Sequence, residues 1–284
     1  MSVPDTVASL LGTAVRRAAA HQSGITGRTW RVTLASGVDV FVKSRAGAPA
    51  GFFAAEVEGL RWLGGTAGGP PLPAVLGFDA ETLVLPWVQT AEPTAEAAQR
   101  LGRELAAMHA AGARGFGAPW PGFIGAAPLD NRSCQQWPEF YWQRRIEPYV
   151  RSLVDGGVFG PAEATTFDQL TDRLPDLAGP AEPPARLHGD LWGGNVLWAV
   201  DGRAWLVDPA AHGGHRETDL AMLALFGASR LDLVLAGYQD VAPLADGWRD
   251  RVPLHQLHPL LVHAVLFGGG YVEQALDAAG RYTG

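Results

Sequence analysis

Residues 187–198 read LHGDLWGGNVLW, and this stretch decides both the fold and the chemistry expected of the chain. Asp190 lies in a loop after a short apolar segment typical of a strand, and Asn195 begins the next apolar segment. Phosphoryl transfer from a nucleotide needs a carboxylate that orients the attacking hydroxyl. The carboxamide of Asn195 is close enough along the chain to reach the same point in space.

A predicted β-hairpin follows this loop directly. Residues 195–200 (NVLWAV) and 203–208 (RAWLVD) have the character of two strands, and Asp201-Gly202 is a dipeptide typical of the turn between them. The second strand ends at Asp208, opposite the start of the first strand. Two carboxylates and one carboxamide therefore meet at the mouth of one hairpin, and such hard oxygen donors suit Mg²⁺.

The residues before this loop predict a small lobe of strands and helices. Gly and Pro fall mostly between the periodic segments, so they mark the turns and connections. In chain order we expect a helix over 4–20, strands over 29–35 and 38–43, a helix over 50–63, and strands over 74–79 and 82–88.

From Thr94 onward the pattern is mainly helical, apart from the hairpin. The order of elements predicts an α+β fold of two lobes: a small antiparallel β lobe with one helix against its sheet, residues 1–88, and a larger, mainly helical lobe, residues 89–284. Its helices are expected over 95–112, 135–154, 161–173, 216–227, 231–240 and 256–279.

Composition narrows the function classes. The formal net charge of −7 argues against nucleic-acid binding, which needs clustered Lys and Arg. Cys134 is the one cysteine, so no internal disulfide framework is possible, and an inert thiol in a reducing compartment is expected. No run of apolar residues approaches the ~18 of a membrane span. We expect a cytoplasmic protein without membrane contact, and the sequence leaves its oligomeric state open.

The pattern HGDxxxxN, followed by a hairpin and an Asp, resembles the catalytic and metal-binding loops of protein-kinase-like phosphotransferases. The longer strings HGDLWGGNV, DPA and GHRETDLAM resemble the fructosamine kinase (ketosamine 3-kinase) family specifically. Further matching stretches span most of the chain: LGRELAAMH at 101–109, GFG at 115–117, FIG at 123–125 and LFGGGY at 266–271.

This resemblance implies a protein-kinase-like two-lobe fold, in which residues 1–88 bind the nucleotide and residues 89–284 carry catalysis and bind the substrate. It also implies roles for single residues. Asp190 would be the catalytic base, and Asn195 and Asp208 would hold Mg²⁺. The enzyme would transfer the γ-phosphate of ATP to the 3-hydroxyl of a ketoamine such as a fructosamine or ribulosamine, on a free amine or a protein lysine. Phosphorylation there would let the sugar leave, which amounts to deglycation. ATP, and not GTP, is an expectation from the family alone.

The small lobe is expected to supply the nucleotide side of the site. Lys43, at the end of a predicted strand, would pair with the α- and β-phosphates, and Glu56 on the following helix would hold it as an ion pair. Glu58 is the rival partner, but the spacing of FFAAE in the resemblance favours Glu56. Gly24 and Gly27, in a turn before the first expected strand, would let backbone N–H groups approach phosphate oxygens.

The segment LVLPWVQT at 83–90 resembles the hinge between the lobes of the family. The backbone of Pro86, Trp87 and Val88 would then face the adenine. Because proline has no N–H, Val88 is the better candidate donor.

Substrate contacts are harder to assign. Trp192 follows the base closely, and its indole could stack on a sugar face. His215, Arg216 and Glu217 lie near the active site in the family, and two interpretations stay open for them: substrate contact, or an ion-pair network that braces the catalytic loop. His212-Gly213 replaces an aromatic pair that is usual in the family, which would remove stacking surface.

Two other functions compete with a ketoamine kinase. A kinase of another small hydroxyl compound, of the aminoglycoside or choline type, shares the HGDxxxxN core, but GHRE and LFGGGY argue against it. A nucleotide-binding pseudokinase is disfavoured because Lys43, Glu56, Asp190, Asn195 and Asp208 are all present. His109, within an expected helix, is interpreted as a core histidine with its hydrogen bonds satisfied.

Overall fold

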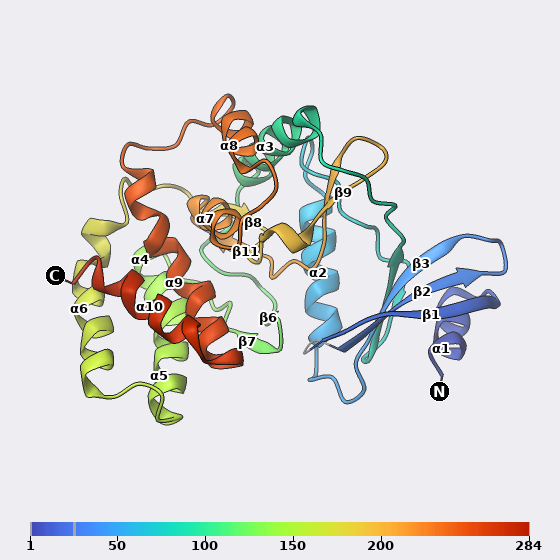
Figure 1. Cartoon of the computed structure of the whole chain (residues 1–284), viewed down its shortest axis with the longest axis horizontal. Coiled ribbons are helices and arrows are strands. Elements are labelled where there is room, and N and C mark those ends of the chain that lie inside the picture. The colour runs from blue at the N-terminus through green and yellow to red at the C-terminus, as the bar shows by residue number, and fades with distance from the viewer. Residues whose placement is uncertain (1, 25–26, 284) are drawn as a thin grey trace.

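A five-stranded sheet in the order β1-β2-β3-β5-β4 dominates the N-terminal lobe, and every neighbouring pair in it is antiparallel (Figure 1). The structure, a computed structural model, describes residues 2–24 and 27–283, with the backbone alone for 22–24. The strands are β1 (Val15–Gly24), β2 (Gly27–Leu34), β3 (Asp39–Ser44), β4 (Gly77–Phe78) and β5 (Thr82–Pro86).

Helices cover both faces of this sheet because side chains alternate along its strands. On one face, α1 (Val3–Leu11) packs Val7 against strand residues such as Val42. On the other face, α2 (Phe52–Gly64) packs Phe53 against residues such as Leu83. The predicted small antiparallel lobe with a helix on its sheet is confirmed, and α1 is a second helix that covers the opposite face.

The prediction of a helix over 4–20 was wrong for the second half of that range. Helix α1 ends at Leu11 because Gly12 takes a left-handed conformation with φ of 63°. Residues 15–24 instead form strand β1, which pairs along its length with β2. The Ala-rich run favours a helix by intrinsic propensity, but pairing with a neighbouring strand overrides that weak preference.

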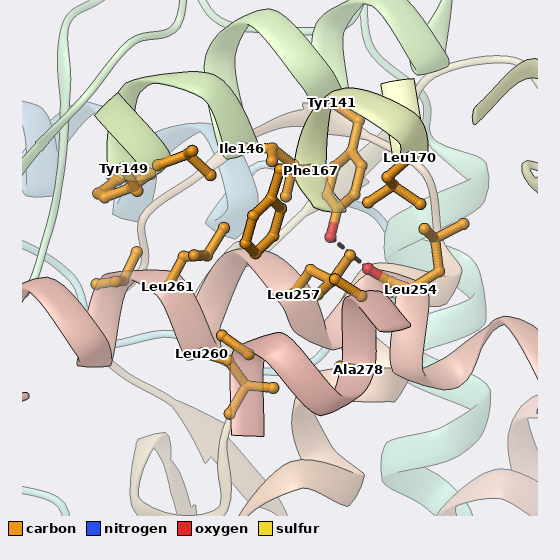
Figure 2. Close-up of a cluster of buried hydrophobic side chains, with 14 of the residues drawn as sticks. Tyr141, Ile146, Tyr149, Phe167, Leu170, Leu254, Leu257, Leu260, Leu261 and Ala278 are labelled. Carbon is orange, nitrogen blue, oxygen red and sulfur yellow. Dashed lines mark hydrogen bonds between the residues drawn. The ribbon is translucent and has the colours of Figure 1, made fainter. Parts of the chain in front are cut away.

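The C-terminal lobe is mainly helical, as predicted. Its helices are α3 (Ala95–Ala110), α4 (Trp137–Phe140), α5 (Glu147–Asp155), α6 (Pro161–Leu177), α7 (Glu217–Leu225), α8 (Leu231–Gln239), α9 (Trp248–Phe267) and α10 (Gly270–Gly280). A large apolar cluster between α4, α5, α6, α9 and α10 forms one core of this lobe. Figure 2 shows part of it, including the Tyr141 hydroxyl, which donates a 2.6 Å hydrogen bond to the Leu254 carbonyl.

Two expected helices are interrupted. The helix expected over 135–154 contains a π-helical stretch over Tyr141–Ile146, between α4 and α5. The helix expected over 256–279 is broken at Gly268 and Gly269, whose φ values of 64° and 61° lie in the region that only glycine enters easily. Helix α9 therefore ends at Phe267, and α10 turns back beside it.

Small two-stranded sheets lie between the helices and carry the loops of the site. The predicted hairpin is present as β9 (Val196–Trp198) and β10 (Ala204–Leu206). Strand β8 (Ala185–Leu187) pairs with β11 (His212–Gly214), and β6 (Gly122–Ile124) pairs with β7 (Ala127–Leu129); neither pair was predicted. Over the described part of the chain, no helix combines the length and apolar character that crossing a membrane requires.

Candidate active site

The loop predicted to be catalytic, residues 188–195 and called the catalytic loop below, begins where β8 ends. Gly189 has a φ of 82°, and a Cβ at this position would lie 2.2 Å from the Ala210 carbonyl oxygen, so only glycine fits between the two segments. The next residue is Asp190. Asn195, at the end of the short 3₁₀ turn Gly193–Asn195, donates from its side-chain nitrogen to the Asp190 carbonyl at 2.8 Å and to the Asp190 carboxylate at 3.1 Å. These two bonds hold the loop closed.

Asp208 follows β10 and reaches the same place from the hairpin. Its φ of 57° is unusual for a residue other than glycine. The preceding Val207 donates its N–H to the Asn195 carbonyl at 3.1 Å, so hairpin and catalytic loop are bonded to each other. The structure therefore brings Asp190, Asn195 and Asp208 together, as the spacing predicted.

Lys43 on β3 completes this group from the N-terminal lobe. Its ammonium donates to both carboxylate oxygens of Glu56, at 2.8 and 2.9 Å, and lies 2.5 Å from Asp208 Oδ1. The rival Glu58 instead lies exposed near Arg61. The predicted pairing of Lys43 with Glu56 is thus present.

The charges at this site perturb one another. Burial, strengthened by the negative charge of Asp208, raises the pKa of Asp190 to about 7, although the N–H of Asn195 favours the ionised form. Burial alone would lower the pKa of Lys43, but the charges of Asp208 and Glu56 outweigh it and hold that pKa above its ordinary value. A carboxyl group that titrates near neutral pH is suited to accept a proton.

Asp219 on α7, which was not predicted as a site residue, is hydrogen-bonded to the catalytic loop. Its carboxylate accepts the backbone N–H groups of His188 at 2.7 Å and of Gly189 at 2.9 Å. His109 lies 3.2 Å from the same carboxylate and 2.9 Å from the Tyr238 hydroxyl, so the prediction of a satisfied core histidine is confirmed. The only signal for Asp219 was its place in the string GHRETDLAM.

Two adjacent cavities flank Asp208. The first, about 250 Å³ and here called the Lys43 cavity, is shared by both lobes. The second, about 310 Å³ and here called the hinge cavity, lies beneath the segment after β5. Phe41 and Asp208 line both. The Lys43 cavity is also lined by Gly27, Lys43, Glu56, Trp120, Phe123 and Asp190, among others. The hinge cavity is also lined by Pro86, Trp87, Val88, Asn195, Leu197 and Val207, among others.

The two glycines expected at the phosphates lie at the ends of β1 and β2, where Gly24 pairs with Gly27. They therefore belong to a hairpin within the sheet, and not to a turn before its first strand. Residues 25–26 of the predicted turn lie outside the described residues. Gly27 lines the Lys43 cavity, and a Cβ there would meet the Ser44 carbonyl oxygen at 2.5 Å.

The donor set at the meeting point of the loops fits a hard divalent cation. Asn195 uses its side-chain nitrogen toward Asp190, which leaves its amide oxygen to face a ligand. Asp208 uses Oδ1 toward Lys43, so its second carboxylate oxygen is available to a ligand. One amide and one carboxylate oxygen are ligands that suit Mg²⁺, which usually keeps several waters and substrate phosphates as its other ligands.

The predicted substrate residues are not placed together. Trp192, within the catalytic loop, is 39% exposed. His215, Arg216 and Glu217 line neither cavity. Arg216 forms a two-bond ion pair with Glu182, each bond 2.7 Å long.

Glu217 accepts bonds of 2.9 and 2.6 Å from Arg251, and His255 lies 3.4 Å away. Burial would raise the pKa of Glu217, but the donors of His255 and Arg251 lower it to about 2. Of the two interpretations of His215, Arg216 and Glu217, these contacts favour an ion-pair network that braces the catalytic loop. His212 is buried within β11 and also lines neither cavity, so its replacement of an aromatic residue removes no stacking surface there.

Comparison with known proteins identifies the family of the chain. The fructosamine kinase family model matches residues 4–282. A probable ketoamine kinase of Enterococcus faecium is 33% identical over 243 residues, which are 84% of this chain and 86% of that protein. One from Thermus thermophilus is 34% identical over 251 residues, 86% of each chain.

Solved structures give the same result. The crystal structure of a presumed fructosamine-3-kinase from Thermobifida fusca superposes with a TM-score of 0.94 at 51% identity, covering 99% of this chain and 98% of that one. An aminoglycoside phosphotransferase crystallised with ADP and hygromycin B has a TM-score of 0.65 at 18% identity, over 99% and 96% of the chains, and shows the shared fold. The chain is a phosphotransferase with this two-lobe kinase-like fold, and it belongs to the fructosamine kinase family.

Proposed function

We propose that this chain is a ketoamine kinase, which transfers the γ-phosphate of ATP to the 3-hydroxyl of a sugar-derived ketoamine such as a fructosamine or ribulosamine. One observation carries the proposal: Lys43, Asp190 and Asp208 line a single cavity, and Asn195 is bonded to Asp190. The acceptor class rests on the relatives from Enterococcus faecium and Thermus thermophilus, which are described as probable ketoamine kinases.

In this proposal residues 1–88 bind the nucleotide and residues 89–284 carry catalysis. The adenine occupies the hinge cavity, against the backbone of 86–88. Pro86 has no N–H, and the Trp87 N–H is already used at 3.3 Å by the Asp39 carbonyl. Val88 is therefore the donor expected to face the adenine. ATP as the nucleotide is supported by ADP in structures of aminoglycoside phosphotransferases that share the fold.

The phosphates then extend from the hinge cavity past Asp208 into the Lys43 cavity. Lys43 pairs with the α- and β-phosphates, held in place by Glu56. Gly24 and Gly27 let backbone N–H groups approach the phosphate oxygens. Asn195 and Asp208 hold Mg²⁺, which when bound neutralises charge on the phosphates.

Asp190 acts on the acceptor. Its carboxylate orients the sugar hydroxyl and accepts its proton while the hydroxyl oxygen forms a bond to the γ-phosphorus. The bond from that phosphorus to the β–γ bridging oxygen breaks, and ADP leaves with the electron pair. Burial of Asp190 raises its pKa to about 7, which favours proton uptake during this step.

A substrate panel tests the proposal. The protein is incubated with ATP, Mg²⁺ and a series of fructosamines and ribulosamines, with an aminoglycoside and choline as comparison acceptors, and ADP release is measured. We expect ketoamine-dependent ADP release that exceeds release with either comparison acceptor. Release no greater than the acceptor-free blank with every ketoamine would overturn the proposal, and stronger release with an aminoglycoside or choline would replace it.

A further inference from the structure

Helix α2, which carries Glu56, is shared by the cores of both lobes (Figure 1). Near its start, Phe53 packs against the sheet of the N-terminal lobe. Near its end, Leu63 is buried in an apolar cluster of the C-terminal lobe, together with residues such as Leu101 of α3. The position of Glu56 therefore depends on how α2 is held against the C-terminal lobe.

The middle of α2 lies directly against the segment that follows Asp208. A Cβ on Gly59 would lie 3.1 Å from the Ala211 Cβ and 3.4 Å from the Pro209 Cγ. A contact of 3.1 Å is closer than carbon atoms normally pack, so the missing side chain of Gly59 is what lets the helix approach this segment. The contact sets the distance between α2 and the residue that precedes the segment, Asp208.

Arg186 holds the C-terminal end of α2. Its Nη1 donates hydrogen bonds to the Trp62 carbonyl at 2.8 Å and to the Thr66 hydroxyl at 3.3 Å. The guanidinium also lies over the indole of Trp62, 4.6 Å from the ring centroid. The Trp62 carbonyl is open to this bond because the Thr66 N–H donates to the Leu63 carbonyl instead.

The positive charge of Arg186 is directed at helix carbonyls and not at an acid. Among the described residues, no carboxylate forms an ion pair with it. The C-terminal end of a helix carries a partial negative charge, so a cation is favourable there. The contact therefore binds α2 through both its last carbonyls and its dipole.

The backbone of Arg186 belongs to β8, the strand that leads into the catalytic loop. It pairs with Gly213 of β11, and the Arg186 Nε donates to the Gly112 carbonyl at 3.3 Å, so the residue is fixed within the C-terminal lobe. Fewer than two turns of helix separate Trp62 from Glu56. Arg186 thus connects the strand before Asp190 to the helix that carries Glu56.

We infer that Arg186 is a positioning residue for phosphoryl transfer, which holds α2 on β8 and so places Glu56 and Lys43 relative to Asp190. This inference rests on the proposed kinase function. Once the ammonium of Lys43 has left Asp208 for the phosphates, Glu56 and α2 connect it to the C-terminal lobe. A shift of α2 would then move the phosphates relative to the acceptor hydroxyl, and such misalignment slows the reaction.

The test is a double-mutant cycle between Arg186 and Glu56. The kcat/KM for ATP, at a saturating ketoamine concentration, is measured for the wild type, Arg186→Met, Glu56→Gln and the double variant. Arg173→Met is the matched control, because Arg173 is an exposed arginine on α6 that donates to the Tyr282 carbonyl, away from α2. Thermal unfolding shows whether each variant is folded.

Two further variants separate position from stability. Arg186→Lys keeps a cation that can reach the Trp62 carbonyl, so it should retain more activity than Arg186→Met. Gly59→Ala keeps Arg186 but pushes α2 away from Ala211, and it is measured with and without Glu56→Gln. This second cycle carries the test where Arg186→Met does not fold.

We expect Arg186→Met to lower kcat/KM for ATP about ten- to hundredfold, with the KM for the ketoamine unchanged. In the Glu56→Gln background the same change should cost less than about threefold, because the pair that Arg186 positions is already broken. Gly59→Ala should show the same dependence on Glu56. Arg173→Met should behave like the wild type in both backgrounds.

Equal losses with and without Glu56→Gln would overturn the inference, and so would an unchanged kcat/KM in folded Arg186→Met. The same cycles are also measured as the Kd for ATP with Mg²⁺ by calorimetry, which needs no acceptor. Absence of ketoamine-dependent ADP release by the wild type would overturn the proposed function. The coupling in Kd would still decide whether Arg186 acts through Glu56.

Discussion

The ammonium of Lys43 lies 2.5 Å from Asp208 Oδ1 and so joins strand β3 of the N-terminal lobe to the end of the β9–β10 hairpin. Glu56 holds the same ammonium from α2, with bonds of 2.8 and 2.9 Å. One cation therefore connects the sheet, its helix and the catalytic hairpin. In the proposed reaction, the ammonium of Lys43 leaves Asp208 and binds the phosphates of the nucleotide. Glu56 keeps its bonds to Lys43 during this change.

Replacing Lys43 tests its assignment to the phosphates. Lys43→Met should lower kcat/KM for ATP by about a hundredfold or more, because the charge that holds the α- and β-phosphates in place for transfer is lost. Steady-state kinetics with varied ATP measures this. Glu58→Gln is the matched control, since Glu58 is exposed and paired with Arg61, and it should behave like the wild type. Equal losses in both variants would contradict the assignment of Lys43.

Replacing Asp190 separates catalysis from binding. Asp190→Asn keeps the shape of the side chain but cannot accept a proton, so we expect kcat to fall by about 10²- to 10⁴-fold. Calorimetric binding of ATP should stay within a few-fold of the wild type. Retained turnover would show that another group is the base. A strong loss of nucleotide binding would mean that Asp190 acts in the nucleotide site.

Glu217 gives a prediction about pH. Contacts with His255 and Arg251 lower its pKa in the folded protein from 4.5 to about 2, so its contribution to stability is complete above pH 4.5 and is lost as the pH falls toward 2. Glu217→Gln should lower the free energy of unfolding by about 3 kcal/mol at pH 7, because Arg251 is left buried without its partner. The difference from the wild type should shrink at pH 3.5, as measured by denaturant titration.

The same variant decides between the two interpretations of GHRE. A bracing role predicts that the folded Glu217→Gln enzyme keeps its KM for the ketoamine near the wild-type value. A tenfold rise in that KM, with the KM for ATP unchanged, would instead place Glu217 at the acceptor.

Asp219 is expected to position the catalytic loop. The carboxylate of Asp219 accepts hydrogen bonds from the backbone N–H groups of His188 and Gly189. In Asp219→Asn an amide N–H group replaces one of the two accepting oxygens, so one of these hydrogen bonds is lost. We expect a loss of about 1–3 kcal/mol in unfolding free energy, together with a lower kcat. Thermal unfolding and kinetics measure the two effects. A variant that is less stable but keeps the wild-type kcat would limit Asp219 to a structural role.

The residues that lie close together along the chain were the ones that sequence predicted well. Asp190, Asn195 and the hairpin that ends at Asp208 form a local unit, so spacing and turn chemistry were enough to place them together. Lys43 and Glu56 were also paired correctly, and the choice of Glu56 over Glu58 came from the resemblance of FFAAE to the family.

Features that depend on distant partners were not predictable in the same way. The Ala-rich run after Gly12 has the composition of a helix, and only its pairing with β2 makes it a strand. Arg216 and Glu217 find their partners Glu182 and Arg251 in other parts of the chain, so the string GHRE could not reveal which interpretation holds.

The most direct test of the account is to identify the product. The wild type and Asp190→Asn are incubated with ATP, Mg²⁺ and a fructosamine, and the acceptor is analysed by ³¹P–¹H correlation NMR. The account predicts phosphate on the 3-oxygen of the sugar, in an amount equal to the ADP formed, and almost none with the variant. Phosphate on a different oxygen would contradict the proposed reaction, and an equal yield from Asp190→Asn would contradict the site.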